Sequence, residues 1–376
     1  MALYLDHNAT SPLKPEVKAL MSQTLDVFGN PSSTHSFGQE ARMVIDGARR
    51  QVATLFDVRP EQVVFTSGGT EANNMAIRSA LATTPHKRIV TSPTEHHAVL
   101  HAATAVSNEI GGRVSAVKVD KNGVVDLDNL ERMLAEGDVG LVSIMAVNNE
   151  TGVCQPVAEI AELCKAANVM YHCDAVQAPG KVATSLPKWG ASLVSLSFHK
   201  LGGPKGVGAL IFAAGVQALP LLHGGGQERG RRGGTENTLG IAGAGLAAQL
   251  ASQTLAEMPR LSTLRDKVES AIKRLSNDIA VVGESAQRTG NVSCFLLPGI
   301  TGDTAVMALD MEGVAVSSGS ACSSGRVNPS HVLMAQGFSE DDAKCSVRLS
   351  WGWNNTEDDV QVCIDAFTKA WQRLKK

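Results

Sequence analysis

Residues 193–206 read LVSLSFHKLGGPKG, a short apolar run that ends in a lysine and a glycine-rich turn. Similar runs, separated by longer helical patterns, occur at residues 63–65, 88–90, 141–147, 169–172 and 207–212. Such alternation is typical of βαβ units, in which helices cover both faces of a mostly parallel sheet. The sequence therefore predicts an α/β fold that binds its ligands at the carboxyl ends of the strands.

The pattern changes after the helical stretch at residues 239–252. A charged amphipathic helix is expected at residues 261–275, followed by short strands at residues 292–297, 314–317 and 346–350. Because 376 residues exceed the usual size of one hydrophobic core, we predict two domains. The large domain covers residues 11–250, and the smaller α+β domain covers residues 251–376 together with residues 1–10.

The composition indicates a globular protein that recognises its partners through defined sites. Mean hydropathy is −0.01, and 34 Lys and Arg residues face 37 acidic residues, which gives a formal charge of −3. No overall positive field attracts nucleic acid or an anionic membrane. Without a signal-peptide pattern or a stretch of membrane-span length, we expect a cytoplasmic protein with no membrane and no nucleic-acid partner.

One of the seven cysteines stands apart from the others. Their odd number and the lack of a C-x-x-C pair argue against a disulfide framework and a structural zinc site. Most of them lie in strand or helix patterns, where a cysteine behaves as a small buried hydrophobe. Cys322 lies instead in SSGSACSSG (residues 317–325), which has no apolar periodicity and is typical of an exposed loop. We therefore treat Cys322 as a candidate nucleophile.

Three further features suggest a phosphate and a reactive amine at the strand ends. Residues 66–74, TSGGTEANN, join a strand to a helix, and this stretch is either a phosphate site at the helix N-terminus or a plain turn. Asp174 ends an apolar run, where a buried carboxylate needs a cation such as a protonated cofactor ring. The alternative is that Asp174 only caps the next helix. Lys200 ends another run, where partial desolvation favours Schiff-base reactivity. Lys205, beyond Pro204, is expected to be solvated.

Several motifs together, in order along nearly the whole chain, resemble those of class I cysteine desulfurases of the NifS/IscS type. These enzymes belong to the fold-type I pyridoxal phosphate enzymes, in the class-V aminotransferase family. The matching motifs are Ser67-Gly68-Gly69-Thr70, Thr94-Glu95-His96, Asn148-Asn149-Glu150-Thr151-Gly152, Asp174-x-x-Gln177, Ser197-x-His199-Lys200, Arg232-Gly233-Gly234-Thr235 and Ser317-Ser318-Gly319-Ser320-Ala321-Cys322-Ser323-Ser324. The chain departs from the pattern at Gly69, where some members have Ala, and at Ser323, where many have Thr.

The resemblance implies both a fold and an activity. The fold would be a fold-type I transferase, with a mostly parallel seven-stranded sheet in the large domain and a smaller α+β C-terminal domain. The protein would be a homodimer that uses pyridoxal 5'-phosphate to remove sulfur from L-cysteine, leaving L-alanine and a persulfide on Cys322. Iron–sulfur scaffold or sulfur-carrier proteins would receive the sulfur, and Cys322 would be a transient iron–sulfur ligand.

The resemblance also implies a role for each matching residue. Lys200 would link covalently to the cofactor and act as base, His96 would stack on the ring and assist proton transfer, and Cys322 would accept the sulfur. Arg348 would clamp the substrate carboxylate, with Asn149 beside ring and substrate. The other cofactor contacts would come from Asp174 at the ring nitrogen, Gln177 at the ring hydroxyl, Gly69, Thr70, Ser197 and His199 at the phosphate, and Thr235 at the phosphate of the neighbouring subunit's cofactor.

Three alternatives remain open at this point. A selenocysteine lyase would use the same scaffold, a cofactor-free thiol hydrolase would pair Cys322 with His331, and a non-catalytic scaffold would hold a cluster through scattered cysteines. Two other local patterns are not interpreted as ligand-binding sites. His97 and His101 lack the glutamate of an H-E-x-x-H zinc motif, and Gly180-Lys181 lacks the other residues of a phosphate-binding P-loop.

Overall fold

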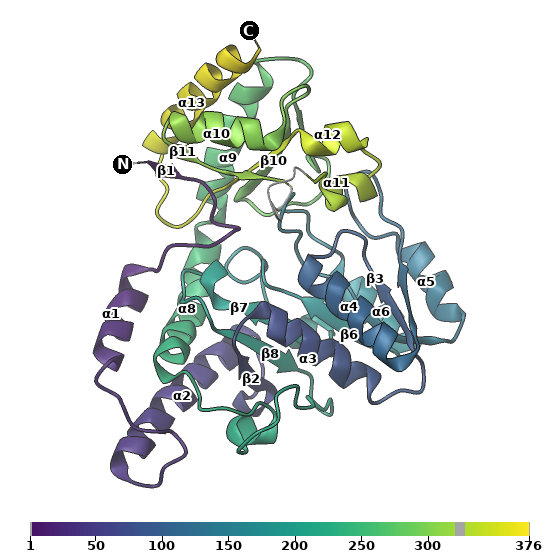
Figure 1. The fold of residues 1–376 in the computed structure, drawn as a ribbon, viewed down its shortest axis with the longest axis vertical. Helices are drawn as coiled ribbons and strands as arrows, with labels where there is room; N and C mark the ends of the chain where they lie inside the picture. The colour runs from purple at the N-terminus through teal and green to yellow at the C-terminus, as the bar shows by residue number, and fades with distance from the viewer. Residues whose placement is uncertain (1, 320–327, 376) are drawn as a thin grey trace.

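The computed structural model describes residues 2–319 and 328–375. Figure 1 shows a larger lower part and a smaller upper part, with both chain termini in the upper part. Helix α8 (Thr238–Ala256) runs from the lower part towards the upper one. Within the described residues, no helix is both long and apolar enough to cross a membrane.

A seven-stranded sheet forms the centre of the lower part. Each strand runs parallel to its neighbours except β8, which is antiparallel to both strands beside it. The prediction of a mostly parallel seven-stranded sheet is therefore confirmed. In sheet order the strands are β2 (Val63–Thr66), β8 (Gly208–Phe212), β7 (Leu193–Ser197), β6 (Met170–Asp174), β5 (Val139–Ser143), β3 (Arg88–Thr91) and β4 (Arg113–Ala116).

Two details of the sheet differ from the sequence-based expectation. Strand β4 was not predicted, because it is an edge strand with mostly exposed residues and lacks a continuous apolar run. The strand expected at residues 141–147 begins at Val139 and ends at Ser143, although the apolar residues after it remain buried. Those residues leave the sheet and lead to the cavity described below.

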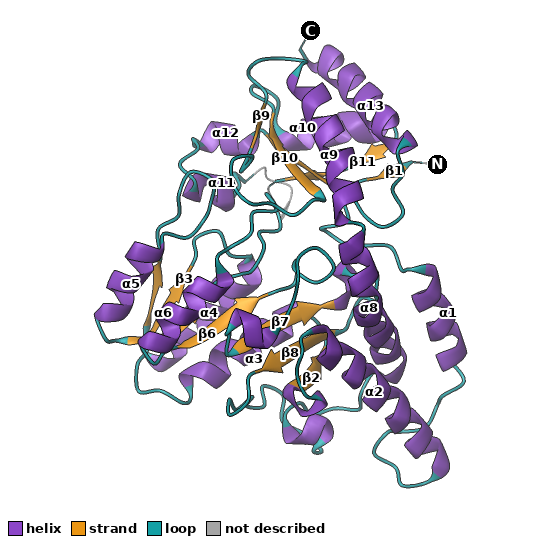
Figure 2. Cartoon of the chain, turned by 180° about the vertical axis from the view of Figure 1, so that it is seen from behind, coloured by secondary structure: helices purple, strands orange, loops and turns teal. Residues whose placement is uncertain are grey.

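Helices cover both faces of this sheet, as Figure 2 shows from behind. Val64 and Leu210 point to the face covered by α3 (Gly69–Leu81) and α4 (His97–Ile110). Their neighbours Phe65 and Ile211 point to the opposite face, because side chains alternate along a strand. The helices on that opposite face are α1 (Pro15–Thr24), α2 (Ser36–Leu55), α5 (Leu127–Ala135), α6 (Val157–Ala166), α7 (Leu186–Trp189) and α8.

The upper part is built around a small antiparallel sheet. Its strands, in order, are β12 (Ser317–Ser318), β13 (Ser346–Ser350), β10 (Val292–Leu296) and β9 (Ala280–Val281). Strand β1 (Leu3–Tyr4) pairs in parallel with β11 (Val314–Ala315), so the N-terminus joins this part. The helices are α9 (Met258–Lys273), α10 (Gly302–Met311), α11 (His331–Ala335), α12 (Glu340–Lys344) and α13 (Asp358–Leu374).

The upper part has its own hydrophobic core. Leu3 and Leu5 from the N-terminus pack there with Trp351 and with apolar residues of α9, α10 and α13. This separate core supports a division into two domains with the N-terminal segment in the smaller one. Because α8 continues to Ala256, the predicted boundary at residue 250 falls inside a helix, and the boundary itself stays a prediction.

A buried ion pair fixes β2, the strand that leads into the 67–70 turn. Both guanidinium Nη atoms of Arg49, on α2, donate to the carboxylate oxygens of Glu228 at 2.7 Å. The backbone N–H of Phe65 donates to the same carboxylate at 2.9 Å, and Arg49 also donates to the carbonyl of Val63 at 2.9 Å. Only 6% of Arg49 and 5% of Glu228 is exposed, so the pair ties helix and strand together away from water.

We predict that Arg49→Leu lowers the free energy of unfolding by about 3–5 kcal/mol, because it leaves the Glu228 carboxylate buried without its cation. Chemical denaturation of the purified protein measures this loss. Arg113→Leu is the control, since Arg113 pairs with Asp138 at the surface and its loss should cost about 1 kcal/mol or less. Equal losses in the two variants would contradict the structural role given to Arg49.

Candidate active site

A cavity of about 770 Å³ lies between the two parts of the molecule. Its walls contain residues that follow the carboxyl ends of β2, β3, β5, β6 and β7, and residues 317–319, 328–331 and Arg348 from the upper part. Parallel strands bring their carboxyl ends to one edge, which is why residues distant in sequence meet here. Ten predicted site residues line this cavity: Gly69, Thr70, His96, Asn149, Asp174, Gln177, Ser197, His199, Lys200 and Arg348.

Two predicted site residues are not among those lining the cavity. Cys322 lies outside the described residues, although Gly319 and Asn328 on either side of that segment both line the cavity. Thr235 is exposed and does not belong to the described lining. Its expected contact across a dimer stays a prediction.

The N-terminus of α3 offers unpaired N–H groups to the cavity. The helix begins at Gly69, and its N-cap residue Gly68 contributes no side-chain hydrogen bond. The first N–H groups of a helix have no carbonyl partner within it and favour an anion. A Cβ atom on Gly69 would lie 2.9 Å from the Val176 side chain, so the glycine permits this close approach. With Ser197 and His199 beside it, this turn suits a phosphate group.

Asp174 is a buried carboxylate with neutral partners. It lies at the end of β6, is 6% exposed, and accepts hydrogen bonds from the Asn73 side chain at 2.8 Å and from the Val176 N–H at 3.0 Å. The second bond fits the alternative that Asp174 caps the following turn. Among the described side chains, however, none forms an ion pair with it. A protonated ring nitrogen would supply the missing cation.

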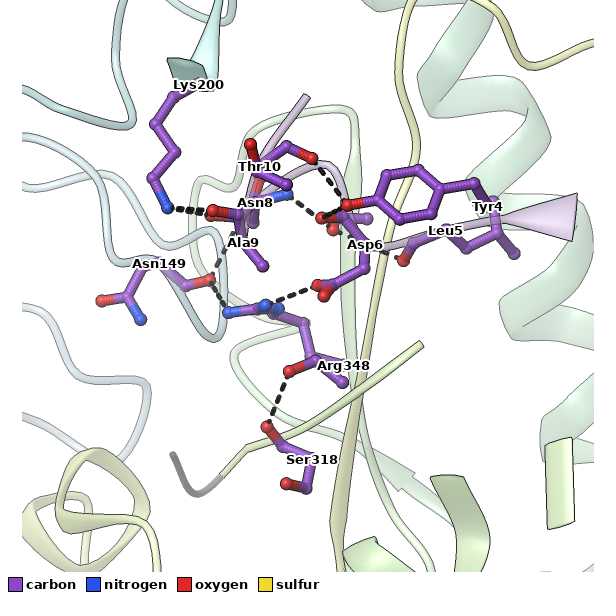
Figure 3. Close-up of polar contacts among 12 residues, drawn as sticks. Tyr4, Leu5, Asp6, Asn8, Ala9, Thr10, Asn149, Lys200, Ser318 and Arg348 are labelled. Atoms are coloured by element: carbon purple, nitrogen blue, oxygen red, sulfur yellow. Dashed lines mark hydrogen bonds and ion pairs between the residues drawn. The ribbon is translucent and has the colours of Figure 1, made fainter. Parts of the chain in front are cut away.

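Lys200 ends a short 3₁₀ helix (Phe198–Lys200) that follows β7. Its amine donates to the carbonyl oxygens of Asn8 at 2.6 Å and Ala9 at 2.7 Å, as Figure 3 shows. Burial and the charge of Arg348, opposed by the charges of Asp6 and Asp174, lower the pKa of Lys200 to about 8. More of this amine is therefore unprotonated near neutral pH than in an ordinary lysine. Lys205, the other amine of this turn, is exposed, as expected.

His96 is held by its own backbone turn. It is the N-cap residue of α4, and its Nδ1 accepts the N–H of Ala98 at 3.0 Å, so a neutral ring carries its proton on Nε2. Burial lowers the pKa of His96, with the charge of Asp174 opposing, which favours this neutral ring. The ring lines the cavity and is placed to exchange a proton with a bound ligand.

Arg348 extends from β13 towards the lower part of the molecule. Its guanidinium donates to the Asp6 carboxylate at 2.7 Å and to the carbonyl of Asn149 at 3.1 Å (Figure 3). Its Nε is buried and has no partner among the described residues. Asp6 therefore orients the guanidinium. The sequence motifs indicated no role for Asp6, which lies outside all of them.

Glu150 is a second residue for which the sequence indicated no role. Its carboxyl group lines the cavity and accepts a hydrogen bond from the Ser330 hydroxyl at 2.6 Å. Burial raises the pKa of Glu150 to about 7, despite the opposing effect of this bond and of Arg348. Its place between Asn149 and Thr151 in a matching motif was the available signal. The motif did not indicate that Glu150 contacts Ser330 in the upper part of the molecule.

Three histidines gather at one side of the cavity without forming a metal site. The rings of His97 and His101 stack with centroids 5.0 Å apart, and His97 lies 4.4 Å from His331. The Nε2 of His331 donates to the carbonyl of Glu95 at 2.8 Å. Within residues 2–319 and 328–375, no group of His, Cys, Asp or Glu side chains could hold a metal ion.

The six described cysteines are poor candidates for a reactive thiolate. All are buried except Cys154, which is partly exposed. Burial raises the pKa of Cys154 to about 11 and the pKa of Cys164 and Cys294 to about 12, and it also raises the pKa of Cys173 and Cys363. Because the thiolate is the nucleophile, these shifts favour inert thiols.

Residues 3–363 match the family described as aminotransferase class-V. The chain is similar to "Cysteine desulfurase IscS" of Dictyoglomus turgidum, with 40% identity over 377 residues that cover 99% of this chain and 95% of the relative. A solved NifS-like protein has a TM-score of 0.92 and 36% identity, with 99% of this chain and 100% of the other covered. The structure described as SspA in complex with cysteine has a TM-score of 0.80 and 28% identity, with coverage of 93% and 99%.

The lowered pKa of Lys200 predicts that its amine is acylated at lower pH than an ordinary lysine. Only the unprotonated amine is nucleophilic, so a pKa of about 8 leaves half of the Lys200 amines reactive near pH 8. An unperturbed lysine, with a pKa of about 10.4, is still almost fully protonated there. Mass spectrometry of ligand-free protein, acylated over a range of pH, measures the midpoint. Lys205 is the internal comparison, and coincident profiles of the two lysines would reject this account.

Proposed function

The chain belongs to the aminotransferase class-V family and, within it, to the cysteine desulfurases of the IscS and NifS type. We propose that its cavity binds pyridoxal 5'-phosphate and that the sulfur of L-cysteine bound there is transferred to Cys322. The protein is a cysteine desulfurase, and enzymes of this family depend on pyridoxal phosphate. The observation that carries the cofactor assignment is one cavity holding both an amine of lowered pKa, Lys200, and a buried carboxylate without a cation, Asp174.

The residues present fit the cofactor at three points. The free N–H groups at Gly69 and Thr70, with Ser197 and His199, would hold the phosphate. Asp174 would supply the negative charge that keeps a ring nitrogen protonated, and Gln177 would contact the ring hydroxyl. When bound, the cofactor supplies an electron sink for negative charge at the substrate Cα.

The side chains around that ring would carry out binding and proton transfer. Lys200 would hold the cofactor covalently and, once released by the substrate, would accept the Cα proton on its Nζ atom. His96, with its proton on Nε2, would lie over the ring and assist proton transfer. Arg348, held by Asp6, would take the substrate carboxylate in a bidentate pair, with Asn149 beside it. L-cysteine as the substrate agrees with the structural relative SspA, which was solved in complex with cysteine.

Cys322 would complete the reaction by accepting sulfur. Its thiolate would attack the substrate sulfur, so that an S–S bond forms while the Cβ–S bond breaks. The electron pair of the broken bond stays with the carbon skeleton, which leaves as L-alanine after protonation. The inert surroundings of the six described cysteines support this assignment by elimination.

Several features of the cellular role are part of the same proposal. The persulfide would be passed to iron–sulfur scaffold or sulfur-carrier proteins, and Cys322 would be a transient cluster ligand. We also propose a cytoplasmic homodimer in which Thr235 reaches the cofactor phosphate of the neighbouring subunit. The family names that match support sulfur chemistry, and a test with each acceptor protein would identify the pathway.

We predict that Arg348→Ala raises the KM for cysteine by roughly ten- to a hundredfold, because it removes a charged hydrogen-bonded contact to the substrate carboxylate. Steady-state kinetics with cysteine measures this change. Arg78→Ala is the matched control, since Arg78 forms a surface pair with Glu109 and should leave KM unchanged. An unaltered KM in Arg348→Ala would show that another group binds the carboxylate.

We predict that Cys322→Ser separates the carbon chemistry from sulfur transfer. The variant should bind the cofactor and change its visible spectrum on addition of cysteine, but form neither persulfide nor alanine, because a serine hydroxyl is too weak a nucleophile towards sulfur. Mass spectrometry locates the added sulfur. The control is Cys154→Ser, which alters the least buried of the described cysteines and should form persulfide normally. Added sulfur on another cysteine of the wild-type protein would overturn the assignment of Cys322.

A further inference from the structure

Lys181 contacts two of the residues that line the active-site cavity. Its amine donates to the side-chain oxygen of Gln177 at 2.5 Å and to that of Asn8 at 2.8 Å. The charged groups that act on it, Lys200 and Arg348, are both cations. Together with burial they lower the pKa of Lys181 well below its usual value. An uncharged amine has two N–H groups, which match these two oxygen acceptors.

The other end of the Gln177 amide is also held. Its Nε2 donates to the backbone carbonyl of Asn8 at 3.0 Å, and 4% of the residue is exposed. Lys200 donates to the same carbonyl at 2.6 Å, in the contact drawn in Figure 3. Because a carbonyl oxygen only accepts hydrogen bonds, a flipped Gln177 amide would place two oxygens face to face. The amide therefore has one favourable orientation, with its oxygen towards Lys181 and its NH2 group towards Asn8.

The acceptor Asn8 is itself fixed by both parts of the molecule. Its side-chain nitrogen donates to the carbonyl of Asn149 at 3.0 Å, and its side-chain oxygen accepts from Asn291 at 3.3 Å. Lys181 is thus one member of a connected network. Removing its amine would leave the Gln177 oxygen without a donor, so that the Asn8 carbonyl alone would hold the amide and its position would be less well fixed.

We propose that Lys181 is a positioning residue that fixes the side-chain amide of Gln177 with its NH2 group available to the ring oxygen of the cofactor. This inference rests on the proposed function, in which Gln177 contacts that oxygen. A hydrogen bond donated to the oxygen stabilises its deprotonated form and lowers the pKa of the bound chromophore. Lys181 thus acts on the cofactor only through Gln177.

The test is a pH titration of the visible absorbance of the holoenzyme. Lys181→Met should raise the midpoint by about 0.5 to 1 pH unit, since the less firmly held amide stabilises the deprotonated form less well. Lys165→Met, which alters an exposed lysine on α6, is the matched control and should titrate like the wild type. A midpoint in Lys181→Met equal to that of the wild type would overturn the proposal.

A double-mutant cycle distinguishes positioning from a direct electrostatic effect. If Lys181 acts through Gln177, then Gln177→Leu alone and the double variant with Lys181→Met should have the same midpoint. If Lys181→Met shifted the midpoint of the Gln177→Leu variant as much as it shifts that of the wild type, the proposal would be overturned. Lys181→Arg keeps donors for the same oxygens and should stay within about 0.3 pH unit of the wild type. Lys181→Arg also serves as the test if Lys181→Met does not fold. A midpoint of Lys181→Arg that moves as far as the midpoint of Gln177→Leu rejects the proposal.

A second measurement does not depend on the cofactor. In cofactor-free protein labelled with ¹⁵N-glutamine, the side-chain signal of Gln177 is assigned by its loss in Gln177→Leu. This signal should move in Lys181→Met and stay in place in Lys165→Met. An unmoved signal in Lys181→Met would overturn the positioning role, whereas a wild-type protein without a visible cofactor band would contradict the proposed function alone.

Discussion

The common direction of the parallel strands is the constraint on which the site depends. Because β2, β3, β5, β6 and β7 point the same way, the residues that follow them meet at one edge of the sheet. Strand β8 runs against its neighbours, and its antiparallel pairing with β2 and β7 holds these two strands in the same direction. The helix N-terminus at Gly69 and the amine of Lys200 are brought together in this way.

The charges in the cavity are arranged to receive anions. Lys200 and Arg348 are both basic, whereas burial raises the pKa of Glu150 and disfavours its negative charge. Among the described residues that line the cavity, Asp174 is a buried carboxylate whose hydrogen-bond donors are both neutral, so a bound cation would complement it. A ligand with a phosphate, a carboxylate and a protonated ring would satisfy all of these groups at once.

The sequence predicted those features that depend on short-range patterns. Apolar runs located six strands of the large sheet, and the residues directly after them, such as Asp174 and Lys200, were recognised as site candidates. Strand β4 was missed because an edge strand needs little burial. Asp6 and Glu150 were given no role, because each acts through a contact between segments far apart in the chain. Lys181 was also given no role, because only one of its two partners, Gln177, is close in the chain, whereas Asn8 is distant. Hydrogen-bond partners of this kind cannot be deduced from spacing, since they depend on how the two parts pack.

The N-terminal segment is what makes the two parts act as one site. Strand β1 pairs with β11 of the upper part, yet only a few residues later the Asn8 carbonyl accepts from Lys200 and Gln177 of the lower part. Asp6, between these contacts, holds Arg348. Any shift of the upper part relative to the sheet would therefore move the guanidinium, the Asn8 carbonyl and the amide orientation together. The groups assigned to the substrate and those assigned to the cofactor bind to Asp6 and Asn8 of one short segment, so the covalent geometry of that segment limits how far these groups can move apart.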